Sequence, residues 1–276
     1  MTYSIPFGKK ALTKGGPLLL IAGPCVIESE EHCMRMAEKI KEIVSPYKKE
    51  ILWVFKSSFD KANRSSVNSQ RGPGLNEGIA ILAKIKKKFK VPVITDIHLP
   101  SQAAKVAKAV DAIQIPAFLC RQTDLVQAAA ATGLPVNIKK GQFLAPWDMK
   151  HPVVKVRQTN NLHAMITERG SSFGYNNLVV DFTGFQTMQD LGVPLIFDAT
   201  HSVQLPGGLG NRTGGRREMA PVLARAAIAV GVDGLFVEVH DNPDKAWSDG
   251  PNQLDLKMFK KLIKQIVAIR RALHAN

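Results

Sequence analysis

Short runs of consecutive apolar residues recur along the chain, separated by longer segments of mixed polarity. Apolar residues at successive positions are typical of strands that are buried on both faces, as in a parallel sheet. The predicted strands are Leu18–Ala22, Ile51–Phe55, Val93–Thr95, Ala112–Ile115, Val136–Ile138, Met165–Thr167, Leu195–Phe197 and Leu235–Val237.

Several of the intervening segments carry apolar residues at helical spacing. In one of them Met36, Ile40 and Val44 recur every four residues and would share one face of a helix. Another begins with a proline, which suits the first turn of a helix. The helices located in this way are His32–Val44, Gly78–Phe89, Pro221–Val230 and Leu254–Leu273.

The alternation of strand and helix through the chain predicts an α/β fold, a (β/α)₈ TIM barrel, with a doubly wound open sheet as the alternative. The length of 276 residues suits one such barrel. Since no linker or shift of composition divides the chain, residues 18–276 are expected to form a single catalytic barrel domain. Residues 1–17 are expected to be a short N-terminal extension that caps the barrel.

The composition is that of an ordinary globular protein, with 45% hydrophobic and 22% charged residues. It excludes general disorder, a fibrous repeat and a small disulfide-rich domain. The chain has three cysteines, Cys25, Cys33 and Cys120, and this small, odd number does not suit a disulfide framework. The apolar run 17–24 is too short to span a bilayer and no cleavage pattern follows it. We therefore expect a cytoplasmic protein with no membrane partner.

The formal net charge is +14, from 37 Lys and Arg against 23 Asp and Glu. Such a charge suits nucleic acid, anionic membranes and anionic substrates equally well. Two basic clusters, 84–90 and 260–271, lie within predicted helices and have no interleaved aromatic residues. They are interpreted as solvated helix faces, and no nucleic-acid partner is expected.

Nearly every predicted strand is followed by an ionisable residue, and a barrel gathers these positions at one rim. Burying so many charges is costly unless they meet ligands or one another, so the rim is the predicted active site. The residues in chain order are Cys25, Lys56, Lys61, Asp96, His98, Arg121, Lys139, Lys140, Glu168, Arg169, Asp198, His201, Glu238, His240 and Asp249.

The rim combines two chemistries. An excess of cations suits phosphate and carboxylate groups, and these cations are Lys56, Lys61, Arg64, Arg121, Lys139 and Arg169. One thiol, one imidazole and two carboxylates could converge on a divalent ion such as Zn²⁺ or Fe²⁺, and these are Cys25, His201, Glu238 and Asp249. The alternative for Cys25 is a packing role, and for His201 a helix cap.

The segment 206–217 is rich in glycine and ends in two arginines, Arg216 and Arg217. It matches neither the P-loop nor the dinucleotide-binding fingerprint. A flexible, basic loop that closes over an anion is the favoured interpretation, and an ordinary surface loop is the alternative.

Long segments of the chain resemble the 3-deoxy-D-manno-octulosonate 8-phosphate synthase family, from about residue 17 to the last helix. The segments are LIAGPCVIES (20–29), FKSSFDKANRSSVNSQRGPGL (55–75), ITDIH (94–98), QIPAFLCRQTD (114–124), NIKKGQFLAP (137–146), ERGSSFGYNNLVVD (168–181), FDATHSVQ (197–204), GGRR (214–217) and SDGPNQL (248–254).

The resemblance implies a homotetrameric barrel that condenses phosphoenolpyruvate with D-arabinose 5-phosphate and water, on the route to lipopolysaccharide. It implies that Lys139, Arg169 and Arg121 hold the phosphoenolpyruvate phosphate, with Lys61 near the carboxylate and Lys56 also at the substrates. Arabinose 5-phosphate would meet Asn63, Arg64 and Ser65, and an adjacent subunit can contribute to its phosphate site.

The family has metal-dependent members with Cys in the AGPC segment and metal-independent members with Asn there. Cys25 places this chain with the former, as does Ser248 at a position where the latter have Cys. One divalent ion (Zn, Fe, Mn or similar) and no organic cofactor are therefore expected. The implied ligands are Cys25, His201, Glu238 and Asp249, and the implied catalytic residues are Lys61, Asp96, His201 and Asp249.

A sister family, 3-deoxy-D-arabino-heptulosonate 7-phosphate synthase, shares the Gly-Pro-Cys segment and the barrel but uses erythrose 4-phosphate. Its sugar-phosphate segment usually reads Lys-Pro-Arg-Thr. This chain has Lys61-Ala62-Asn63-Arg64-Ser65-Ser66 instead, which favours the five-carbon sugar phosphate.

Overall fold

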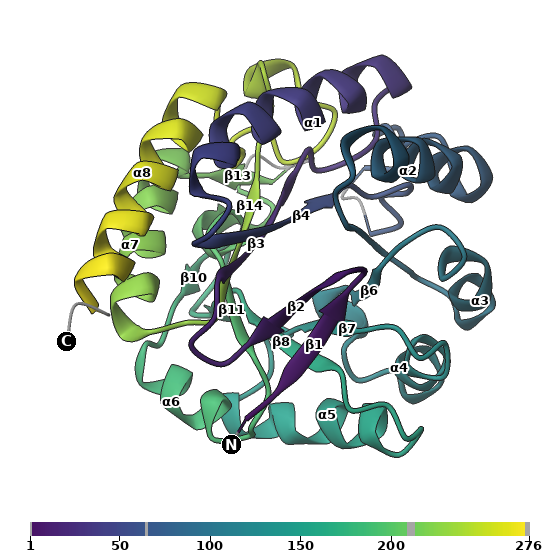
Figure 1. Ribbon diagram of the computed structural model, residues 1–276, viewed down its shortest axis with the longest axis vertical. Helices are drawn as coiled ribbons and strands as arrows, with labels where there is room; N and C mark the ends of the chain where they lie inside the picture. Colours follow the sequence, from purple (N-terminus) through teal and green to yellow (C-terminus); the bar gives the residue numbers. More distant parts are fainter. Residues whose placement is uncertain (1, 64–65, 209–212, 274–276) are drawn as a thin grey trace.

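The computed structural model describes residues 2–63, 66–208 and 213–273. Eight parallel strands form a closed barrel in the order β11-β14-β3-β4-β5-β6-β7-β8, and helices surround it (Figure 1). The predicted TIM barrel is thus confirmed and the open sheet is wrong. The strands are β3 (Leu18–Gly23), β4 (Ile51–Lys56), β5 (Val93–Asp96), β6 (Ala112–Ile115), β7 (Val136–Lys139), β8 (Ala164–Glu168), β11 (Leu195–Asp198) and β14 (Gly234–Glu238).

Every predicted barrel strand is present, but most continue one residue further than the apolar pattern indicates. The added residue is usually charged and ends the strand: Lys56, Asp96, Lys139, Glu168, Asp198 and Glu238. These side chains therefore project from hydrogen-bonded barrel backbone and not from the loops beyond it. Their positions are fixed by the sheet.

The predicted helices are confirmed as α1 (Glu30–Val44), α2 (Leu75–Phe89), α7 (Ala220–Val230) and α8 (Leu256–Leu273). The side chain of Ser29 caps α1 by accepting a hydrogen bond from the His32 amide, 3.1 Å away. Sequence periodicity missed four shorter helices of four to eight residues, α3 (Ala103–Val106), α4 (Thr123–Ala130), α5 (Lys150–Arg157) and α6 (Thr183–Gln189). One or two turns contain too few apolar positions to establish a period.

A β-hairpin closes the end of the barrel opposite the charged strand ends. Its strands, β1 (Ser4–Phe7) and β2 (Lys10–Thr13), are antiparallel and lie across the barrel in Figure 1. Phe7 and Leu12 join a buried cluster with Ile21 and Phe236 inside the barrel, while a larger cluster lies between strands and helices. The barrel interior next to the hairpin is therefore filled with apolar side chains, and the charged side chains lie at the opposite end of the barrel.

Shorter elements lie in the loops between the barrel strands and the helices. The paired strands are β9 (Ser171–Ser172) with β10 (Leu178–Val179), and β12 (Gln204–Leu205) with β13 (Gly214–Gly215). Single 3₁₀ turns are η1 (Ser45–Tyr47), η2 (Pro100–Gln102), η3 (Ala117–Leu119), η4 (Pro146–Met149), η5 (His201–Val203), η6 (Arg217–Met219) and η7 (Pro243–Lys245). Across the described ranges, the helices are too short or too polar to cross a bilayer.

Candidate active site

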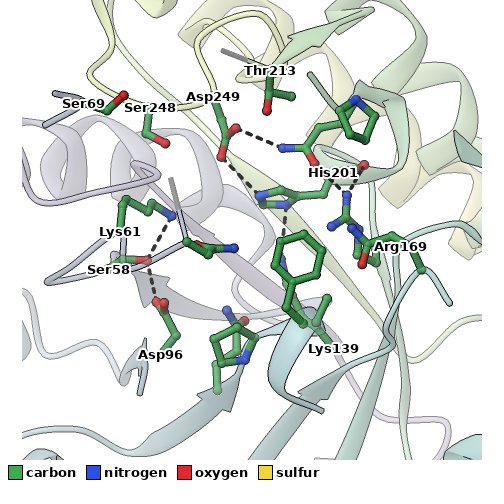
Figure 2. Close-up of a pocket in the computed structure, with 18 of the residues that line it drawn as sticks. Ser58, Lys61, Ser69, Asp96, Lys139, Arg169, His201, Thr213, Ser248 and Asp249 are labelled. Carbon is green, nitrogen blue, oxygen red and sulfur yellow. Dashed lines mark hydrogen bonds and ion pairs between the residues drawn. The ribbon is translucent and has the colours of Figure 1, made fainter. Parts of the chain in front are cut away.

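An open cavity of about 250 Å³ lies at the charged strand ends (Figure 2). The predicted site residues that line it are Lys56, Lys61, Asn63, Asp96, Lys139, Arg169, His201 and Asp249. Cys25 and Glu238 are fully buried in its wall, in contact with Asp249 and Lys56 respectively. The expected convergence of residues from distant strands is therefore present in the structure.

Other residues expected at the rim lie elsewhere. The side chain of Arg121 is exposed and does not line the cavity. Lys140 and Glu168 also lie outside the lining, with Lys140 Nζ 3.6 Å from a Glu168 oxygen. The predictions for Arg64 and Ser65 concern positions outside the described residues, next to Asn63, which does line the cavity.

Three potential metal ligands meet where β3 and β14 adjoin. One atom each from Cys25, Glu238 and Asp249 lies within 4.8 Å of the others. The Cys25 thiol donates to Asp249 Oδ2 at 3.2 Å, and His201 Nε2 lies 3.6 Å from the same oxygen. His201 Nε2 is also 3.7 Å from Glu238 Oε1. This sulfur, nitrogen and oxygen donor set fits a borderline divalent ion.

The electrostatics of this group also fit a cation. Burial raises the pKa of the Cys25 thiol, and the nearby Glu238 carboxylate raises it further. Burial alone would raise the pKa of Glu238, but His201 and Lys56 hold it below its usual value. Glu238 is therefore ionised, and its Oε2 has no hydrogen-bond partner in the described part of the chain. A buried, unpaired carboxylate oxygen is a strong acceptor for a metal ion.

Asp198 organises the opposite wall. Its Oδ2 accepts from His201 Nδ1 at 2.7 Å and from Lys139 Nζ at 2.5 Å. With the Nδ1 proton directed at Asp198, the Nε2 lone pair of His201 is free on the side of Glu238 and Asp249. Burial would lower the pKa of His201, but the Asp198 carboxylate raises it above the usual value.

Ser58 joins three charged residues on the far side of the cavity, as Figure 2 shows in part. Its hydroxyl donates to Asp96 Oδ1 at 2.5 Å and accepts from Lys56 at 3.0 Å and Lys61 at 3.2 Å. His98 Nε2 lies 3.1 Å from the other Asp96 oxygen. Asp96 is thereby held ionised despite burial, because His98 and Lys56 lower its pKa.

Gln204 bridges the anion-binding and metal-binding sides. It accepts from Arg169 Nη2 at 2.6 Å and donates to Asp249 Oδ1 at 3.0 Å. Arg169 Nε is buried and has no partner among the described residues, so part of the guanidinium is available to an anion. Sequence reasoning missed both Ser58 and Gln204, because a search for ionisable residues passes over neutral ones.

The glycine-rich segment borders the same cavity. Its flanks pair as β12 and β13, and Pro206, Gly207 and Thr213 line the cavity; residues 209–212 are outside the described residues. At Gly215 an added Cβ would lie 1.7 Å from the Asn252 side chain, so only glycine fits there. The expectation of a basic loop over an anion stays a prediction.

Comparison with known proteins shows close relatives over most of the chain. Residues 5–274 match the family model described as DAHP synthetase I family. Several relatives carry the name 2-dehydro-3-deoxyphosphooctonate aldolase. That of Desulfatibacillum aliphaticivorans is 60% identical, covering 94% of each chain, and that of Cyanothece sp. is 58% identical with the same coverage. That of Desulfosudis oleivorans is 54% identical and covers 99% of this chain and 97% of its own.

Proposed function

We propose the activity that follows from family membership, since the chain belongs to the DAHP synthetase I family and, within it, to the 2-dehydro-3-deoxyphosphooctonate aldolases. The protein is an aldol-type transferase. It condenses phosphoenolpyruvate with D-arabinose 5-phosphate and water, and it releases 3-deoxy-D-manno-octulosonate 8-phosphate and phosphate for lipopolysaccharide synthesis.

The observation that carries this function is the cavity itself, which holds cations for two anionic substrates beside a set of metal ligands. Arg169 and Lys139 are assigned to the phosphate of phosphoenolpyruvate, because both line the cavity near His201. Lys61 is assigned to the carboxylate from the opposite side, and Lys56 lies behind it, bonded to the same hydroxyl. The two groups of cations would hold the two anionic groups, phosphate and carboxylate, at opposite ends of one small substrate.

The loop between Asp60 and Arg71 is assigned to arabinose 5-phosphate. These two side chains form a bidentate ion pair, with nitrogen–oxygen distances of 2.8 and 2.6 Å, and Lys61 N–H donates to the Arg71 carbonyl. The ends of the loop are thus tied together, and Asn63 is held at the cavity. Arg64 and Ser65 follow in the chain and complete the assigned phosphate site.

Cys25, His201, Glu238 and Asp249 would hold one divalent ion, which supports assignment to the metal-dependent class. When bound, such an ion polarises an oxygen of the substrate aldehyde or an attacking water. The donor set and the unpaired Glu238 oxygen support this assignment. Zn, Fe and Mn all suit these ligands.

The carbon–carbon bond forms between C3 of phosphoenolpyruvate and the aldehyde carbon, and water adds at C2 before phosphate leaves by cleavage of its C–O bond. Lys61 and Asp96, which are linked through Ser58, are assigned the movement of a proton on one side of the cavity. His201 and Asp249 are assigned the orientation of water on the other side. Lys139 and Arg169 stabilise the departing phosphate.

A homotetramer is also part of this proposal. Large apolar side chains are exposed on the loops that follow β6, β7 and β8: Phe118, Phe143, Trp147, Phe173 and Tyr175. An aromatic surface of this kind favours burial against a second copy. Arg121, three residues beyond Phe118, is also exposed, and in a tetramer it would reach the phosphoenolpyruvate phosphate of an adjacent subunit.

A phosphate-release assay tests the function directly. The purified protein is given phosphoenolpyruvate with either arabinose 5-phosphate or erythrose 4-phosphate, with and without a chelator. We expect release only with arabinose 5-phosphate, and its loss on chelation with recovery when Zn²⁺ or Mn²⁺ is restored. Preference for erythrose 4-phosphate would refute the substrate assignment, and full activity after verified metal removal would refute the metal assignment.

A further inference from the structure

Asp249 lies in the long loop between β14 and α8, and its backbone conformation requires support. Its φ is +52°, in the left-handed region that is uncommon for a residue other than glycine. On one side the loop is fixed by Arg217, which donates to the Gly250 carbonyl at 2.7 Å. Gln253 also donates to the Ser248 carbonyl at 2.8 Å.

Glu28 fixes the other side of this loop. It follows β3, three residues after Cys25, and its Oε1 accepts from the Trp247 amide at 3.0 Å. The same oxygen lies 3.1 Å from His240 Nε2. Burial would raise the pKa of Glu28, but these two contacts lower it, so the carboxylate is ionised. One charged oxygen therefore joins the start and the middle of the loop.

The hydrogen bonds of His240 define its proton. The Asn242 amide donates to His240 Nδ1 at 2.9 Å, so Nδ1 must be the acceptor and Nε2 must carry the hydrogen that is donated to Glu28. His32 lies beside this ring, with centroids 4.4 Å apart, and its Nε2 is 3.2 Å from Asp241. Glu28, His32 and His240 also have the composition of a metal site.

A metal ion on His240 Nε2 would displace that hydrogen to Nδ1, directly facing the Asn242 N–H. Asp241 Oδ1, 3.2 Å from Nδ1, could accept that hydrogen, but the Asn242 N–H would lose its acceptor in a site where His240 is only 3% exposed. With the hydrogen on Nε2, the Asn242 N–H keeps its acceptor. The hydrogen-bond pattern therefore favours a structural support over a second metal centre.

We propose that Glu28 and His240 are positioning residues that hold Asp249 at the cavity by anchoring its loop to the segment after Cys25. The proposal deepens the proposed function and rests on the assignment of Asp249 as a metal ligand. Neither residue lines the cavity. Their effect on the reaction passes through the position of the Asp249 carboxylate, which lies 3.2 Å from Cys25 Sγ.

The test compares Glu28→Ala with Glu28→Gln, which keeps an oxygen acceptor. It also compares His240→Asn with His240→Gln. The Asn side chain keeps an acceptor for the Asn242 N–H but is too short to reach Glu28, whereas the Gln side chain is long enough to donate to Glu28. For Glu28→Ala and His240→Asn we expect Mn²⁺ affinity to fall by about 10–100-fold, as when the partner of a metal ligand is removed. Hydrogen exchange of the Trp247 amide should accelerate, while amides of β3 and β14 stay protected. The Gln variants should largely recover both properties.

Glu42→Ala, an exposed change on α1, is the matched control and should behave as the wild type. Unchanged Mn²⁺ affinity and Trp247 exchange in Glu28→Ala would overturn the proposal, as would equal acceleration of exchange throughout the barrel. The proposal would also be overturned if Cys25→Ala still bound one Mn²⁺ and the double variant Cys25→Ala/His240→Gln did not. That result would show that the cluster of Glu28, His32 and His240 itself binds metal. Because neither readout uses turnover, failure of the proposed activity would be seen separately in the phosphate-release assay.

Discussion

Replacement of Ser58 by alanine removes the one oxygen that joins Asp96, Lys56 and Lys61. Ser58 is fully buried in the wall of the cavity. Asp96 keeps His98 but loses its 2.5 Å donor, and a hydrogen bond to a buried charged group is worth about 1.5–3 kcal/mol. We expect the unfolding free energy to fall by about 2 kcal/mol and the melting temperature by about 3–4 °C.

The adjacent Ser57 provides a matched control. It is equally buried, but its hydroxyl lies beside the Cys33 thiol without a regular hydrogen bond, so Ser57→Ala should leave stability nearly unchanged. Thermal denaturation of the two variants gives the comparison. Ser58→Ala should also raise the KM for phosphoenolpyruvate, because the Ser58 hydroxyl accepts a hydrogen bond from Lys61 Nζ at 3.2 Å and helps to hold that side chain in place. Equal melting temperatures for the two variants would refute the reasoning.

Three further predictions address the assigned ligands. Cys25→Ala should abolish metal retention and activity, while Cys25→Asn should lose metal but keep more activity, as shown by metal content and turnover. Asp60→Asn should raise the KM for arabinose 5-phosphate severalfold with little change in kcat, because the ion pair with Arg71 is lost. The Arg71 hydrogen bond lowers the pKa of Asp60 in the folded protein. The ion pair therefore contributes its full stability above about pH 4 and loses it as the pH falls. Urea unfolding at a series of pH values should show the free energies of wild type and Asp60→Asn converging in acid. Arg121→Ala should reduce kcat/KM for phosphoenolpyruvate without lowering the melting temperature, since the side chain is exposed.

The barrel was predictable because its strands are buried on both faces. Every residue of Leu18–Gly23 is buried, so apolar side chains are required at successive positions. The same reasoning failed at the strand ends, where Lys56 and Glu238 belong to strands but are charged. They tolerate burial because they contact each other at 3.3 Å, and such long-range pairing is invisible in a local pattern.

The site was predictable to the extent that strand ends determine position. Cys25, Glu238 and Asp249 meet because β3 and β14 are neighbours in the closed barrel. Arg121 was expected at the same rim, but it follows a 3₁₀ turn and not a strand directly, and its side chain is exposed. The direction of a side chain beyond a strand depends on loop geometry, which residue type alone does not determine.

The net charge of +14 comes both from lysines on the outer helices and from cations at the strand ends. Many lysines of α2 and α8 are exposed to solvent, whereas the cations in the cavity are partly neutralised by neighbouring carboxylates. Lys56 faces Glu238 at 3.3 Å and Lys139 faces Asp198 at 2.5 Å, so these two buried carboxylates offset part of the charge of the cations that line the cavity, Lys56, Lys61, Lys139 and Arg169. A divalent ion held by Glu238 would compete with Lys56 for that carboxylate and add two positive charges to the cavity. The metal and the anionic substrates should therefore strengthen each other's binding, because the ion adds to the positive charge that attracts the anions.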